Sequence, residues 1–221
     1  MSPLQVEPDH LVVAALNLRD GCDWVENLLR VRPQPGGKHT LMGTHNALLS
    51  LGPRFYLEVI AVDPEAAAPG RSRWFDLDEP RMKADLAEGP ALVHWVARTR
   101  DIGEAHARMP ALGDVLPMAR GDFRWQITVP ADGRRPGRGL VPTLIQWSGG
   151  RHPTDLLPDS GVRLVAIAGE HPEPATVRAQ LGTLGLSDTF KVTYGKSPRV
   201  AAMIRTNAGI ATLSKSAASE A

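Results

Sequence analysis

One structural unit, a strand followed by a helix and three short strands, occurs twice in this sequence, and the repeat limits the fold more than any other feature. The first copy starts with the apolar run "HLVVAAL", continues with a helical pattern and ends with the strand "FYLEVIAV". The second copy starts with "ALVHWVA" and ends with "PTLIQW". The repeat predicts an α+β fold of two paired βαβββ modules, about 4–63 and 90–148, joined by a linker at 64–89.

A third and less complete unit follows the second module. The stretch "GVRLVAIAGEHPEPATVRAQLGTLGL" predicts a strand, a helix and a glycine stop, and three more short strands follow it. We therefore expect one domain at 4–150 and a partial third βαβββ unit at 161–214 that covers a sheet edge. A disordered tail is expected at 215–221.

Polar residues interrupt the apolar strands at matching places. Glu58 lies inside an apolar run, where a carboxylate is costly unless it is paired, hydrogen-bonded or bound to a metal. His10 and His94 lie on the first strands of the two modules; Glu58 follows His10 by 48 residues, and Gln146 follows His94 by 52. If the modules pack as a pseudo-symmetric pair, the four side chains converge. Their nitrogen and oxygen donors suit one divalent ion, namely Zn, Ni, Mn, Co or Fe(II).

Each of these residues also has a plainer interpretation. A single strand histidine is commonly a core or surface residue, and Glu58 could pair with an arginine such as Arg120. Arg120 could instead hold a substrate carboxylate through two hydrogen bonds, with Trp125 beside it across a tight turn. His152, in a Pro-rich turn, is expected to be solvated. The repetition in two modules favours the metal site.

Charge and cysteine content exclude several classes of protein. A formal net charge of +1 argues against general binding of nucleic-acid backbones, and a single cysteine excludes an internal disulfide and a Cys-based zinc site. The segment "MSPLQVEPDH" lacks a signal-peptide pattern, and no window approaches the ~20 apolar residues of a membrane helix. We expect a cytoplasmic protein without nucleic-acid or membrane partners. Its wealth of Ala, Arg, Gly and Pro suggests a bacterial source.

The strand motifs "DHLVV", "LEV", "LVHWV" and "LIQW" resemble the vicinal oxygen chelate (VOC) superfamily, especially its glyoxalase-like branch, over about residues 8–150. The resemblance implies a cupped half-barrel in which the first and last strands of each module hold a metal, here through His10, Glu58, His94 and Gln146. It also implies that the second and third strands line the cup. The residues then expected to contact a substrate are His39, His45 and Asn46, together with Arg120 and Trp125.

The resemblance further implies a metal-dependent lyase or isomerase that acts on a small carbonyl or dicarbonyl substrate through a stabilised enolate or oxyanion. Gln146 cannot accept a proton, so Glu58 is expected to be both ligand and base. A ring-cleaving dioxygenase is also disfavoured, because the resemblance implies a carboxylate on the last strand of the second module, where this sequence has Gln146. Two alternatives stay open: a metal-free protein of the same fold that sequesters small molecules, and a structural or partner-binding domain. A homodimer is also left open.

Overall fold

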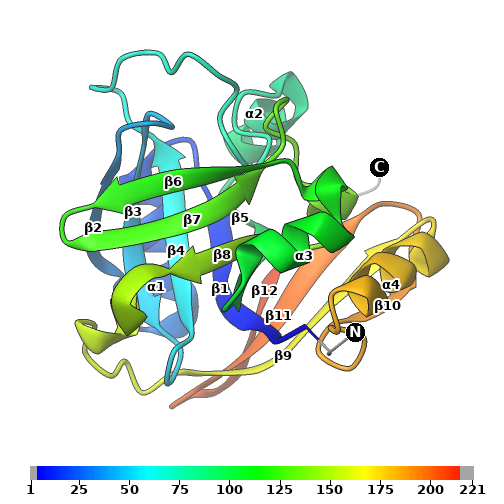
Figure 1. Ribbon diagram of the computed structural model, residues 1–221. Helices are drawn as coiled ribbons and strands as arrows, with labels where there is room; N and C mark the ends of the chain where they lie inside the picture. Colours follow the sequence, from blue (N-terminus) through cyan, green and yellow to red (C-terminus); the bar gives the residue numbers. More distant parts are fainter. Residues whose placement is uncertain (1–3, 215–221) are drawn as a thin grey trace.

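The computed structural model describes residues 4–214, so the tail predicted to be disordered, 215–221, lies outside the described residues. Two βαβββ modules form one curled eight-stranded sheet with the strand order β2-β3-β4-β1-β5-β8-β7-β6, a half-barrel (Figure 1). The elements of the first module are β1 (Val6–Ala14), α1 (Leu18–Leu29), β2 (Gln34–His39), β3 (Thr44–Ser50) and β4 (Tyr56–Val62). Those of the second are β5 (Ala91–Thr99), α3 (Ile102–Arg108), β6 (Asp114–Arg120), β7 (Phe123–Val129) and β8 (Thr143–Trp147).

The two modules meet at the antiparallel pair β1–β5, and each last strand lies parallel to its own first strand. Both module helices begin at capping side chains: Asn17 accepts a hydrogen bond from the Asp20 amide, and Asp101 accepts one from the Glu104 amide. These caps lie at matching places in the repeat. The chain therefore leaves each first strand in the same way and crosses the outer face of the sheet.

Alternation along the strands gives the sheet two buried faces. On β1, Leu11 and Val13 join the core beneath the helices, whereas Val12 and Ala14 join a second cluster inside the cup. All four side chains are inaccessible to solvent. Because both faces are covered, the central strands are apolar along almost their whole length, and the polar residues that face the cup stand out.

The linker between the modules fills the open side of the cup. Trp74, Phe75 and Leu77 belong to the cluster inside the cup, and α2 (Pro80–Ala87) packs beside them. Phe75 and Asp76 both have φ of 61°, a left-handed conformation that costs free energy for residues with a side chain. The Arg135 Nε donates to Asp76 Oδ2 at 2.6 Å and so ties this segment to the second module.

The C-terminal unit has the predicted succession of elements, and its strands pair differently from those of the two modules. It consists of β9 (Arg163–His171), α4 (Pro174–Thr183), β10 (Lys191–Tyr194), β11 (Arg199–Thr206) and β12 (Gly209–Ser214). Its sheet has the order β10-β9-β11-β12, with β10 parallel to β9, whereas in each module the last strand pairs with the first. It therefore shares the element order of the modules but not their strand pairing.

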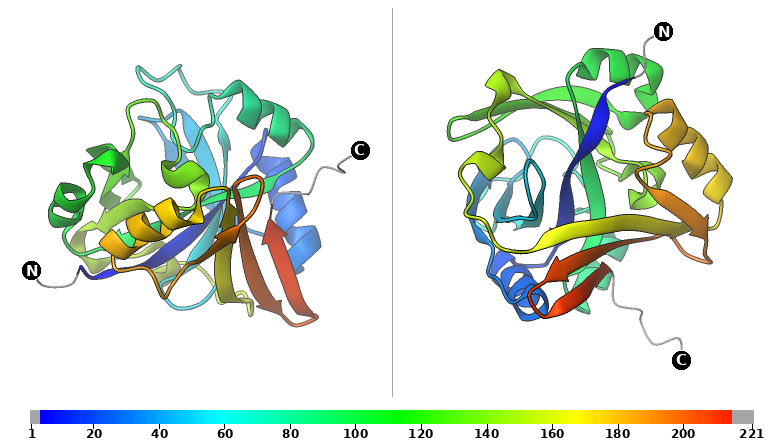
Figure 2. Two further views of the ribbon diagram at one scale, coloured as in Figure 1. Left: turned by 90° about the vertical axis from the view of Figure 1, so that its right-hand side faces the viewer. Right: turned by 90° about the horizontal axis from the view of Figure 1, so that it is seen from below.

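This unit forms a separate layer against the outer face of β5 (Figure 2). The Phe190 ring stacks on the buried Trp95 ring, with centroids 5.0 Å apart. Short 3₁₀ turns occur at Pro110–Leu112, Pro136–Gly139, Ser148–Gly150 and Pro153–Asp155. In the described part of the chain, every helix is too short or too polar to cross a membrane. The cytoplasmic location stays a prediction.

Candidate functional site

Glu58 is the centre of a polar cluster inside the cup. It lies on β4, is almost fully buried, and accepts a hydrogen bond from the Asn46 side-chain amide at 2.5 Å. Its other oxygen, Oε2, faces His10 Nε2 at 3.7 Å, and Oε1 lies 4.0 Å from His39 Nε2. The Asn46 amide is therefore the hydrogen-bond donor to this carboxylate among the described residues, and the two imidazole nitrogens lie near it but beyond hydrogen-bond distance.

A buried aspartate fixes the orientation of His10. The β1–β5 register shifts between Pro8 and His10, and this bulge brings Asp9 Oδ1 within 2.7 Å of His10 Nδ1. Burial alone would raise the pKa of Asp9, but hydrogen bonds with His10 and His152 outweigh it and hold the pKa well below its usual range. The ionised Asp9 accepts the Nδ1 proton of His10, so His10 directs Nε2 towards Glu58.

His152, like Asp9, is a residue of this cluster that the sequence interpretation missed. It is fully buried, although its Pro-rich turn suggested solvent exposure, and its Nε2 lies 3.2 Å from Asp9 Oδ2. The indole nitrogen of Trp147 donates to the same oxygen at 3.0 Å. The sequence feature that could have indicated an ordered turn here is the capping pattern "HPTD". In it, Asp155 accepts a hydrogen bond from the His152 amide and fixes the turn.

A glycine pair on β2 makes room for Asn46. The Gly37 amide donates to Asn46 Oδ1 at 3.0 Å, and a Cβ added at Gly36 would lie 2.1 Å from that oxygen. The Asn46 amide group is thereby turned towards Glu58. It also lies 3.4 Å from Nε2 of His39, whose pKa is lowered to about 3 by burial and by Arg120, so His39 is neutral.

Aromatic side chains enclose these polar groups. Tyr56 stacks on His10 with ring centroids 4.5 Å apart, and Trp74 and Trp125 meet His39 edge-on. The cavity that remains has a volume of about 20 Å³, roughly the space of one water molecule. It is lined by His10, His39, Tyr56, Glu58, Trp74, Phe75, Arg120, Trp125, Ile127, Ile145 and Trp147.

Two groups at the cavity have no hydrogen-bond or carboxylate partner among the described residues. Trp74 Nε1 is buried and has no hydrogen-bond partner among the described residues. Arg120 forms no ion pair with a carboxylate of the described part, although it lines the same cavity. A buried donor without an acceptor costs about 1–3 kcal/mol, so Trp74 Nε1 suits an oxygen-bearing ligand, and the half-buried Arg120 guanidinium suits an anionic one.

The structure does not bring the four predicted metal ligands together. Gln146 points to the outer face, where its Oε1 accepts a hydrogen bond from the Ile102 amide at the start of α3. His94 is inside the cup, but its Nδ1 lies 3.1 Å from the Gly139 carbonyl and its Nε2 lies 3.0 Å from Thr143 Oγ1. In the described residues no three His, Cys, Asp or Glu side chains are arranged to hold a metal ion, so the predicted set does not fit one.

The strand registers explain the error at Gln146. Glu58 lies beside Val12 and Thr143 lies beside Val96, so both follow the histidine of their module by two positions along the paired first strand. Thr143 is therefore the counterpart of Glu58. Gln146 lies three residues further along β8 and points to the opposite face.

The predicted substrate-contacting residues divide between two places. His39, Arg120 and Trp125 line the cup, and Asn46 contacts Glu58 there. His45 is adjacent to Asn46 on β3 and so points to the other face, where it lines a groove beside α1. Its predicted position in the cup is wrong because strand neighbours face opposite ways.

Comparisons with known proteins give a family match and structural neighbours. A family model described as a glyoxalase-like domain matches residues 9–185. The crystal structure of a hypothetical protein from Staphylococcus aureus is similar at a TM-score of 0.61, with 12% identity over 87% of each chain. Methylmalonyl-CoA epimerase from Mycobacterium tuberculosis has a TM-score of 0.40, 17% identity, and coverage of 66% of this chain and 89% of its own. None of the curated proteins matches the sequence.

Proposed function

Because the chain belongs to the glyoxalase-like domain family of the VOC superfamily, we propose that its cup binds a small carbonyl compound and catalyses proton transfer at the carbon beside the carbonyl. The observation that carries the proposal is the buried pair of Glu58 Oε2 and His10 Nε2, 3.7 Å apart, with the far side of His10 held by Asp9. A buried carboxylate beside an oriented imidazole suits general acid–base catalysis.

Glu58 is the proposed base. Asn46 holds one of its oxygens, which leaves Oε2 to face the cavity. The C–H bond of the substrate breaks, its proton passes to Glu58, and its electron pair moves onto the carbonyl oxygen to give an enolate. The enolate is then protonated again by Glu58, which returns to its carboxylate form, so the step conserves protons and electrons and needs no further reactant.

Two donors are suited to the oxygens of the substrate. The unpartnered Nε1 of Trp74 is a fixed donor for the carbonyl oxygen, on which negative charge develops. Arg120, without an ion-pair partner in the described part, suits a second anionic group such as a carboxylate. We therefore narrow the substrate class to small carbonyl compounds that also carry a carboxylate.

The substrate must displace part of the linker, since the cavity of about 20 Å³ is too small for such a molecule. The strained residues Phe75 and Asp76 follow Trp74 in the segment that fills the cup. Opening at this segment would admit the substrate, and closure would exclude water during proton transfer.

Metal dependence has no part in this proposal, because the residues expected to supply four ligands do not converge. The second candidate function is metal-free sequestration of a small molecule. The buried arrangement of Glu58, His10 and Asp9 favours catalysis over sequestration, which requires no oriented acid–base pair.

Solvent exchange distinguishes the two functions. A panel of small oxo-carboxylates would be incubated with the protein in D₂O and followed by proton NMR. We expect protein-dependent loss of a C–H signal beside a carbonyl in at least one compound. Binding without exchange across the panel would support sequestration. If no compound binds and none exchanges, the assignment of the cup as a substrate site is contradicted.

A further inference from the structure

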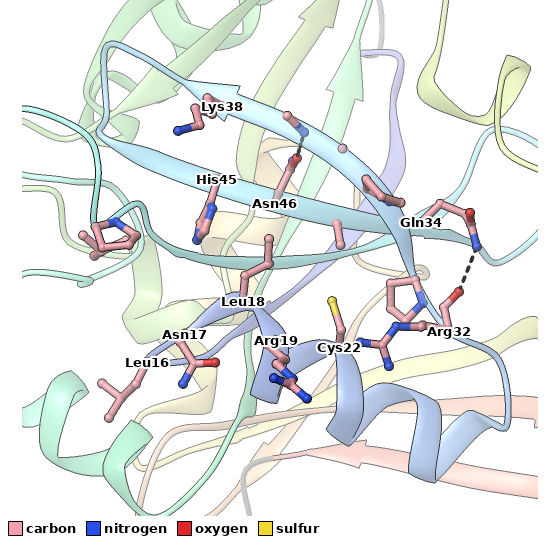
Figure 3. Close-up of a pocket in the computed structure, with 17 residues that line it drawn as sticks. Leu16, Asn17, Leu18, Arg19, Cys22, Arg32, Gln34, Lys38, His45 and Asn46 are labelled. Atoms are coloured by element: carbon pink, nitrogen blue, oxygen red, sulfur yellow. Dashed lines mark hydrogen bonds between the residues drawn. The ribbon is translucent and has the colours of Figure 1, made fainter.

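A second and much larger cavity lies outside the cup, between α1 and the β2–β3 hairpin (Figure 3). This groove has a volume of about 800 Å³, within the range of roughly 300–1,000 Å³ that is typical of small-molecule sites. Its apolar floor includes Leu18, Cys22, Ala47 and Val62. None of these residues contributes to the polar cluster around Glu58.

The charged residues of the groove are all basic. Its described lining contains Arg19, Arg32, Lys38 and His45 but no aspartate or glutamate. Arg32 and Lys38 are each bound to two carboxylates, whereas the nearest carboxylate contact of Arg19, to Asp23, is 3.9 Å long. Arg19 is therefore the lining cation whose charge is least neutralised by neighbours.

His45 supplies a ring nitrogen without a hydrogen-bond partner among the described residues. Figure 3 shows its imidazole extending from β3 towards Leu18 of α1, across the groove. The Nε2 atom is buried and has no hydrogen-bond partner among the described residues. The groove thus combines an apolar floor, one under-neutralised guanidinium and one unsatisfied ring nitrogen.

We infer that this groove binds an amphipathic carboxylate, a molecule with an extended apolar body and one carboxylate end. The apolar body lies along Leu18, Cys22 and Ala47, and the carboxylate lies between Arg19 and His45. A guanidinium matches the two oxygens of a carboxylate, and the carboxylates that border the groove, Asp23, Glu26, Asp63 and Glu65, lie against Arg32 and Lys38 and not in its described lining. This inference does not depend on the function proposed for the cup.

Calorimetric titration of the full chain with decanoate tests the inference, with decanol as the uncharged probe. We expect decanoate to bind at one site and decanol to bind at least tenfold more weakly. Arg19→Glu and His45→Leu should each lower decanoate affinity about tenfold, since each removes a contact to the charged end. The matched control is Arg81→Glu, an equal charge change at an exposed position on α2, and it should leave affinity within twofold.

Cys22 reports where the probe binds, because it lines the groove and is the only cysteine of the chain. Burial raises the pKa of its thiol, so alkylation by iodoacetamide should be slow, and bound decanoate should slow it further. Trp74→Phe, a change inside the cup at a residue that does not line the groove, should bind decanoate as the wild type does, which separates this site from the cup. The inference is overturned if decanoate does not bind or if decanol binds with equal affinity. It is also overturned if Arg19→Glu and Arg81→Glu lose the same affinity for decanoate, or if bound decanoate does not slow the alkylation of Cys22.

Discussion

His10 and His94 occupy matching places on the first strands of the two modules, and their partners determine what each can do. The Nε2 of His10 faces Glu58, and its Nδ1 faces Asp9. Both ring nitrogens of His94 lie within hydrogen-bond distance of Gly139 and Thr143. His94 is thus a structural residue between β5 and the chain that precedes β8, whereas His10 is the one oriented for chemistry.

The buried neutral histidines should make stability depend on pH. Burial, with Arg135 second, lowers the pKa of His94 to about 3, and the pKa of His39 is also about 3. The unfolded chain binds protons near pH 6.5 and the folded chain does not, so the free energy of unfolding should fall as pH drops from 6.5 towards 3. Each histidine contributes a slope of up to about 1.4 kcal/mol per pH unit.

Urea unfolding at pH 4, 5, 6 and 7 measures this slope for the wild type and for His94→Asn. The variant should be less stable at neutral pH but show a shallower slope, because one buried histidine is gone. Equal slopes in the two proteins would show that His94 does not stay neutral in the folded state.

Part of the site could be predicted from single residues. Glu58 stood out because a carboxylate in an apolar strand must have partners, and the nearby Asn46 and His39 were expected in the cup. Asp9 and His152 could not be paired in advance, because a bulge in β1 and a turn 143 residues later bring them together. Such contacts depend on tertiary packing and leave no local pattern.

At the scale of elements, Gln146 of β8 stabilises the start of α3 and does not face the cup. Its side chain satisfies the Ile102 amide, one of the amides without a partner in the first turn of that helix. Gln146→Ala should lower the free energy of unfolding by about 1 kcal/mol, the usual net value of one hydrogen bond, and leave activity in the cup unchanged. Thermal unfolding measures the loss of stability, and the solvent-exchange assay measures the activity. If the folded variant no longer catalyses C–H exchange, Gln146 contributes to the site in the cup after all.

The linker segment over the cup is held by Arg135, which donates to Asp76 and to the Val93 carbonyl, both at 2.6 Å. Arg135→Gln should loosen this segment and speed amide hydrogen exchange of residues 73–78 at least tenfold. Arg134→Gln is the matched control, because the Arg134 side chain is mostly exposed and lies 3.4 Å from Glu79. Equal exchange rates in both variants would mean that Arg135 does not hold the linker closed.

The succession of helices and strands along the chain could be predicted from the sequence better than the pairing of the strands within the sheets. Apolar runs, capping residues and glycine stops reveal strands and helices locally, and they located both modules. The C-terminal unit showed the same succession of elements, yet its strands pair as β10-β9-β11-β12. Pairing depends on which surfaces meet in space, so a shared succession of elements does not imply a shared sheet.

For the whole molecule, the C-terminal sheet acts as part of one core. Phe190 and Trp95 are fully buried against each other, and residues of both sheets belong to one apolar cluster. Phe190→Ala should lower the free energy of unfolding by about 3 kcal/mol or more while unfolding stays a single transition. Tyr194→Ala, at a position 71% exposed, should change it by less than about 0.5 kcal/mol. Separate unfolding transitions would show that the two sheets are independent units.

The proposed chemistry of the molecule rests on Glu58 as a base in a closed cup, and the comparison of Glu58→Gln with Glu65→Gln tests it most directly. Glu65 is exposed and lies outside the cup, so it controls for the same chemical change. For a carbonyl compound whose C–H exchanges with D₂O in the wild type, Glu58→Gln should lower the exchange rate at least 100-fold and keep binding affinity within about threefold. Glu65→Gln should behave as the wild type does. Exchange that persists at the wild-type rate in folded Glu58→Gln would contradict the role of this carboxylate as the base.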